Sequence, residues 1–125
     1  MQSNDNWEMF WGMKSRGFCR FYKNLYWGDS VKMHSQVKWK LYHGSGQFTI
    51  YCIKRADSDG DQLDIIHCAF LQQKYFRSNP AYIYGIAGNY KEALDIVLKI
   101  TQEALEAGYE GRLLEYLDSK DTKKD

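Results

Sequence analysis

The feature that most constrains the fold is a long amphipathic helix predicted over residues 89–107. Asn89 and Glu92 have the spacing of a capping box, in which two side chains satisfy backbone N–H groups at the start of a helix. Gly108 suits the left-handed residue that ends many helices. Between them, residues recur at helical spacing: Tyr90, Leu94, Val97, Thr101 and Ala104. Such a helix buries one side, so we expect it to pack on one face of a β-sheet.

Two strands joined by a tight turn are predicted upstream of this helix. Val37, Trp39 and Leu41 alternate with polar neighbours over residues 37–42, which predicts a strand with these three side chains in the core. Residues 47–53 form the next strand, because Gly44-Ser45 suits the centre of a type II′ hairpin turn. In that register Val37 lies opposite Cys52, and Trp39 lies opposite Ile50.

A second hairpin is predicted around Asp59-Gly60, a pair that suits a type I′ turn. It leads into a third strand over residues 63–68 and places Arg55 opposite Asp64. Residues 69–76 fit either a continuation of that strand or a short helix, and both alternatives stay open. Residues 81–87 predict the fourth strand.

The chain ends are predicted to be helical or disordered. The spacing of four apolar residues predicts a helix near residues 14–27: Phe18, Phe21, Tyr22 and Leu25. A shorter helix containing Leu113, Leu114 and Leu117 follows Gly108, and the polar tail 118–125 is expected to be disordered. Residues 1–125 therefore predict a single α+β domain. Its sheet is a mainly antiparallel four-stranded meander, accompanied by an N-terminal helix and two C-terminal helices.

The composition predicts a cytoplasmic protein that needs no cofactor or metal. Cys19, Cys52 and Cys68 lack the Cys-x-x-Cys spacing of zinc sites, and we expect buried, reduced thiols. There is no apolar run of signal-peptide or membrane-spanning length, so no membrane contact is expected. Residues 1–55 hold nine Lys or Arg and three Asp or Glu, whereas residues 56–125 hold eight and thirteen. This asymmetry indicates either an acidic partner or pairing between the two halves.

Two candidate binding surfaces follow from these patterns. One is the polar face of the first two strands, where cations lie beside aromatic rings: Lys38, Lys40, Tyr42, Thr49, Tyr51 and Arg55. Such a face can stack the bases of single-stranded nucleic acid, although it can equally be an ordinary solvated face. The other is the apolar leader over residues 1–13, containing Trp7, Phe10 and Trp11, which suits a protein interface unless it folds back onto the core.

Catalytic signals are weak. Cys52 and His67 become cross-strand neighbours in the predicted register, but no third group orients the imidazole, so a packed thiol and a core histidine are the favoured interpretation. Gly88-Asn89 precedes a helix N-terminus that can hold an anion, yet helix capping explains the same residues.

Four short segments resemble a group of small bacterial proteins of unknown function, mostly from gut Firmicutes. They are Val37-Lys38-Trp39-Lys40-Leu41, Gln47-Phe48-x-Ile50-Tyr51, Leu63-Asp64-Ile65-Ile66 and Tyr84-Gly85-Ile86-Ala87-Gly88-x-x-x-Glu92-Ala93. The similarity covers residues 25–107 and implies a compact cytosolic bacterial protein, with no activity to transfer. We therefore expect a non-enzymatic binding or adaptor protein that acts through protein contacts or self-association. Single-stranded nucleic-acid binding is the second hypothesis, and an enzyme using Cys52 and His67 is the third.

Overall fold

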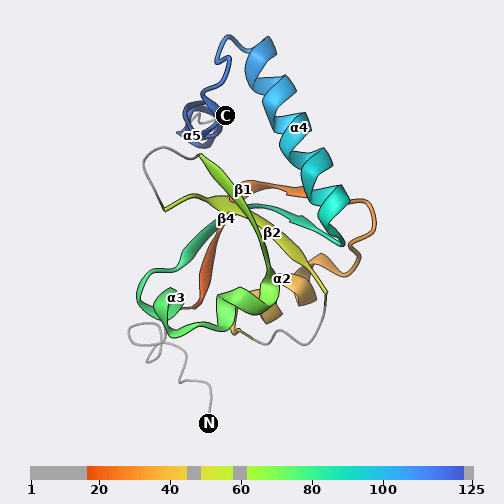
Figure 1. Cartoon of the computed structure of the whole chain (residues 1–125), viewed down its shortest axis with the longest axis vertical. Helices are drawn as coiled ribbons and strands as arrows, with labels where there is room; N and C mark the ends of the chain where they lie inside the picture. Colours follow the sequence, from red (N-terminus) through yellow and green to blue (C-terminus); the bar gives the residue numbers. More distant parts are fainter. Residues whose placement is uncertain (1–16, 45–48, 58–61, 123–125) are drawn as a thin grey trace.

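The computed structural model describes residues 17–44, 49–57 and 62–122. In chain order its elements are β1 (Cys19–Trp27), α2 (His34–Tyr42), β2 (Tyr51–Arg55), β3 (Leu63–His67), the 3-10 helix η1 (Cys68–Gln72), α3 (Lys74–Ser78), β4 (Ala81–Ala87), α4 (Tyr90–Glu106) and α5 (Leu113–Thr122). The fold is α+β with four strands in one sheet, as the sequence predicts (Figure 1). The apolar leader, residues 1–13, lies outside the described residues.

The sheet is mixed, not a meander. Its strand order is β1-β4-β2-β3, and β2 pairs antiparallel with both β3 and β4. β1 pairs in parallel with β4, so the prediction of a mainly antiparallel meander is wrong for this pair. β1 also occupies most of the segment 14–27 predicted as a helix. Its apolar residues mimic helical spacing because the strand buries side chains on both faces and its register shifts between Phe21 and Tyr26.

Residues 37–42 belong to α2, so the predicted first strand and its hairpin are wrong. Val37 and Leu41 are buried, which fits the i and i+4 positions of one helical face as well as it fits alternation. Trp39 separates the two interpretations: a strand would bury it beside Val37 and Leu41, whereas in the helix its side chain is 58% exposed. In a segment as short as residues 37–42, Val37 and Leu41 fit both the helical and the strand spacing, and Trp39 alone distinguishes them.

The antiparallel pairing of β2 with β3 is confirmed, with a register one residue from the prediction, whereas the predicted turn at Asp59-Gly60 lies outside the described residues. Lys54, not Arg55, pairs with Asp64, and Arg55 pairs with Leu63. Lys54 shares the face of β2 that carries Cys52 and is buried there; it is 3% exposed and is the one buried charged residue within the described ranges. Its Nζ lies 3.6 Å from the carboxylates of both Asp57 and Asp64 and donates to the Arg55 carbonyl at 3.0 Å.

The C-terminal half agrees closely with the sequence. β4 and α4 are confirmed, and the Asn89 side chain accepts the Glu92 N–H at 2.8 Å, as a helix cap does. Gly108 follows α4 with a left-handed φ of 88°. Residues 69–76 form parts of η1 and α3, which decides the open alternative in favour of helical turns. The prediction of a disordered tail is wrong for residues 118–122, which are helical because α5 continues through Thr122.

Two helices cover opposite faces of the sheet. Val37 of α2 packs in the cluster that contains Cys52, whereas Ile96 and Ile100 of α4 pack in the cluster that contains Ile53 (Figure 1). Cys52 and Ile53 are consecutive in β2 and therefore point to opposite faces. Within the described ranges, no helix is both long enough and apolar enough to cross a membrane.

Candidate functional site

The structure separates the six residues predicted to share one sheet face. Three lie on α2 (Lys38, Lys40, Tyr42) and three lie on or just before β2 (Thr49, Tyr51, Arg55). Tyr51 is half-buried on the side that α4 covers, where its ring meets Tyr90 edge-on with 5.8 Å between centroids. The predicted platform on the first two strands is therefore wrong, because half of its members belong to a helix. The leader residues Trp7, Phe10 and Trp11 lie outside the described residues.

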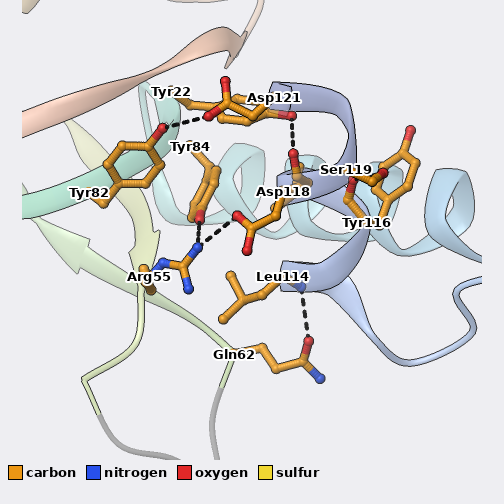
Figure 2. A network of polar contacts seen from close by, with 11 residues as sticks. Tyr22, Arg55, Gln62, Tyr82, Tyr84, Leu114, Tyr116, Asp118, Ser119 and Asp121 are labelled. Atoms are coloured by element: carbon orange, nitrogen blue, oxygen red, sulfur yellow. Dashed lines mark hydrogen bonds and ion pairs between the residues drawn. The ribbon is translucent and has the colours of Figure 1, made fainter. Parts of the chain in front are cut away.

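Arg55 instead belongs to a polar network that attaches α5 to the sheet (Figure 2). Its Nη2 donates to the Tyr84 hydroxyl at 2.7 Å and to the Asp118 carboxylate at 2.8 Å. Nearby, the Tyr22 hydroxyl donates to the Leu117 carbonyl at 2.8 Å. A cavity of about 380 Å³ beside this network is lined by Arg20, Arg55, Pro80, Tyr82, Asp118 and Asp121. Its two cations face two carboxylates, so the charges are balanced within the protein and the network serves to hold α5.

Cys52 and His67 do not form a nucleophile and base pair. Cys52 pairs with Ile66, and His67 pairs with Tyr51, so the two side chains lie on opposite faces of the sheet. Burial raises the pKa of the Cys52 thiol well above its usual range, which leaves the sulfur protonated and unreactive. His67 Nδ1 accepts the Ala69 N–H at 3.0 Å and so caps η1. Among the residues that the structure describes, no group of three or more His, Cys, Asp or Glu is arranged to hold a metal.

A groove lies between the end of β1 and the first turn of α2. Its volume is about 780 Å³, and it is lined by Trp27, Gly28, Asp29, Val31, Lys32, Met33, His34, Ser35 and Gln36. The Trp27 and His34 rings stack in parallel with 3.6 Å between centroids and 3° between planes. His34 Nε2 also lies 3.0 Å from the Val31 carbonyl, which fixes the orientation of the ring. The groove thus contains a preformed aromatic wall.

Met33 is the strained residue of this groove. It has φ 52° and ψ 55°, the left-handed conformation, and no other non-glycine residue in the described ranges has positive φ. Its apolar side chain is 64% exposed. Backbone strain of this kind persists where the surrounding structure holds it, and it concentrates at binding sites and switch regions.

Glu92 of α4 holds the loop that carries Met33. Its carboxylate accepts the Gly88 N–H at 2.7 Å, the Ser30 hydroxyl at 2.8 Å and the Ser30 N–H at 3.0 Å. These bonds, the Gly88 N–H first, lower the pKa of Glu92 below its ordinary 4.5. Gly28 leaves room for the carboxylate, because a Cβ there would overlap Glu92. The N-terminus of α4 is thus occupied by the protein's own carboxylate, which agrees with the capping interpretation of Gly88-Asn89.

A second groove adjoins the first along α2. Its volume is about 350 Å³, and it is lined by Phe21, Ser35, Lys38, Trp39, Tyr42 and His43. Trp39 stacks on His43 with 4.1 Å between centroids, and His43 Nδ1 lies 2.8 Å from the Trp39 carbonyl. The Lys38 ammonium lies 5.3 Å from the centroid of the Phe21 ring. Ser35 lines both grooves, so they form one continuous surface.

We call this region the α2 surface: Trp27, Lys32, Met33, His34, Ser35, Lys38, Trp39 and His43. The charged residues lining its two grooves are Lys32, Lys38 and Asp29, so the surface has a small excess of positive charge beside its aromatic rings. Of the six residues predicted to form a binding platform, Lys38 and Tyr42 line the second groove of this region. The exposed Trp39 was assigned to the core, and the groove at Trp27 had no signal in the sequence because it depends on β1 being a strand. The i, i+4 pair Val37 and Leu41 was the one local pattern that could have indicated the helix.

Searches with this chain match no protein-family model, no curated protein and no solved structure. The residues of the α2 surface therefore carry the functional argument by themselves.

Proposed function

We propose that this chain is a non-enzymatic binding protein, and that its α2 surface captures a protein partner through an apolar anchor flanked by acidic groups. One observation carries the proposal: Met33 and Trp39 are 64% and 58% exposed, and each lines one of the two grooves that meet at Ser35.

Residue types at the α2 surface favour a protein partner. Trp and Met are enriched at the centres of protein interfaces, where a few large side chains supply most of the binding energy. Trp39 is already oriented by its stacking on His43, so little side-chain entropy is lost when a partner covers it. Lys32 and Lys38 flank the two grooves and favour acidic groups on the partner, which accelerate encounter and fix orientation.

Single-stranded nucleic acid is the second candidate, and the stacked rings favour it. Trp27 and Trp39 each stack on a histidine, and nucleobases stack on such rings at about 1–3 kcal/mol per base. The neighbouring lysines suit phosphates equally well. The enzymatic hypothesis has less support, because Cys52 and His67 lie on opposite faces of the sheet.

A photo-crosslinking amino acid at Ser35 tests the proposal in cells that naturally produce the protein. Ser35 is exposed and lines both grooves, whereas Gln102 is an equally exposed residue on α4 and serves as the control position. We expect a protease-sensitive adduct from Ser35 that disappears when Trp39→Ala is added and does not form from Gln102. A nuclease-sensitive adduct would establish the second candidate instead. The absence of an adduct from Ser35, or the same adduct from Gln102, would refute binding at the α2 surface.

A further inference from the structure

Helix α4 exposes an apolar stripe that the core does not use. Its buried side consists of Ala93, Ile96, Ile100 and Ala104. A second row is solvent-exposed and comprises Leu94, Leu98, Thr101 and Leu105, of which the leucines are 42%, 65% and 48% exposed. Successive members of this row are four, three and four residues apart, which is the seam spacing of helices that pack along their length. We call this row the α4 stripe.

The α4 stripe faces the β3 side of the sheet. At the start of α4, Tyr90 meets the ring of Tyr51, which in turn lies edge-on to His67 of β3 at 5.2 Å. The opposite flank of α4 faces β1, since Glu103 accepts a hydrogen bond from the Tyr26 hydroxyl at 2.6 Å. Leu94 and Leu98 are exposed on the flank of α4 that lies nearer to β3 than to β1.

Within residues 17–44, 49–57 and 62–122, nothing pairs with the outer edge of β3, and part of its face is exposed. It is the last strand of the sheet, and among the described strands it pairs with β2 alone. Leu63, Ile65 and His67 alternate toward the α4 side and are each only half-buried. A β-edge beside an apolar helix flank offers backbone groups and apolar area to one and the same partner.

We propose that a second copy of this chain occupies this region, with α4 packed antiparallel to α4 and β3 beside β3 about one two-fold axis. The α4 stripe is self-complementary in that arrangement: Leu98 faces Thr101 of the second copy, and Leu94 faces its Leu105. The ends of α4 are complementary in charge. Lys91, which pairs with Asp95 of its own chain at 3.4 Å, would lie by the C-terminal end of the other α4, where Glu106 and the helix dipole carry negative charge.

Dimerisation through α4 and β3 leaves the α2 surface on the far side of each sheet. The dimer therefore presents two copies of that surface, and a partner with two binding segments gains affinity from their linkage. This consequence rests on the proposed function, whereas the dimer itself does not.

Sedimentation equilibrium from about 1 µM to about 1 mM protein tests the dimer over the range of weak to moderate affinity. We expect the wild-type chain to associate to a dimer and Leu98→Glu to raise the dissociation constant by at least about tenfold, because the substitution places two carboxylates at the centre of the interface. Leu98 is 65% exposed in the monomer, so the far-UV circular dichroism of the variant should match that of the wild type. Trp39→Glu is the matched control, since it changes an equally exposed apolar residue on the opposite face.

A pair of complementary variants tests the antiparallel register. Thr101→Lys alone should also weaken self-association, because two lysines then meet the leucines of the seam. A mixture of Leu98→Glu and Thr101→Lys chains should form heterodimers, in which the new carboxylate faces the new ammonium. A wild-type chain that stays monomeric, or a folded Leu98→Glu variant that remains dimeric, would overturn the interface. Loss of the dimer in Trp39→Glu would show that self-association occurs through the α2 surface instead.

Discussion

Replacing Glu92 with alanine should destabilise the protein by about 3 kcal/mol, because its carboxylate accepts three hydrogen bonds, two from Ser30 in the loop before α2 and one from the Gly88 N–H that precedes α4. Hydrogen bonds to an ionised acceptor contribute about 1.5–3 kcal/mol each when fully buried. Glu92 is only half-buried, so solvent screening reduces each to about 1 kcal/mol. Glu92→Gln keeps one neutral acceptor oxygen and should cost about half as much.

The pH dependence of these variants follows from the lowered pKa of Glu92. A carboxyl group with a folded-state pKa below its unfolded value stabilises the fold above the unfolded pKa, near 4.5, and loses this contribution as pH falls through the folded pKa. The difference in free energy of unfolding between wild type and Glu92→Gln should therefore be full at about pH 7 and smaller at about pH 3.

Urea unfolding followed by circular dichroism measures this difference at both pH values. Ser30→Ala is the matched control, because it removes one of the three bonds and should leave most of the pH dependence in place. If the free energy of unfolding differed between wild type and Glu92→Gln by the same amount at both pH values, the ionised Glu92 carboxylate would not be the source of the stabilisation. The near-ultraviolet signal gives a local readout, since the loop also positions the stacked Trp27 and His34 rings.

Three further perturbations test other parts of the structure. Lys54→Met should change the free energy of unfolding by less than about 1 kcal/mol, because Asp64 stays hydrated. Lys54→Glu should lower it by at least about 4 kcal/mol in the same urea assay. Equal effects of the two substitutions would contradict the buried ion pair. The thiols of Cys19 and Cys52 should react with a thiol reagent at about pH 8 only when urea unfolds the chain, because burial raises the pKa of Cys19 to about 12 and that of Cys52 well above its usual range. Rapid labelling of the native protein would show that this core opens. Gly108→Ala should lower stability by about 1 kcal/mol through its left-handed φ alone, since no atom lies within 4 Å of the added Cβ; a cost several times larger in thermal unfolding would imply a packing role instead.

The exposed row on α4 shows how a correct local prediction can hide a wrong assumption about burial. The stripe that identified the helix, beginning with Tyr90 and Leu94, is mostly not the side that packs on the sheet. Ile96 and Ile100 occupy the core instead. The helix is therefore apolar around more than one face, and that surplus is the basis for the proposed dimer.

The sequence alone determined the elements whose signals are local. The cap at Asn89 and the left-handed Gly108 depend on hydrogen bonds and dihedral angles within a few residues, so their sequence signals survive without tertiary context. Tertiary structure decided between helix and strand for residues 19–27 and 34–42, because short apolar windows satisfy both periods. β1 is a strand because β4, far along the chain, supplies its parallel partner, and α2 is a helix because the sheet face buries Val37 and Leu41 while leaving Trp39 in solvent. The α2 surface arises from these two long-range choices, and neither is recorded in any short stretch of the chain.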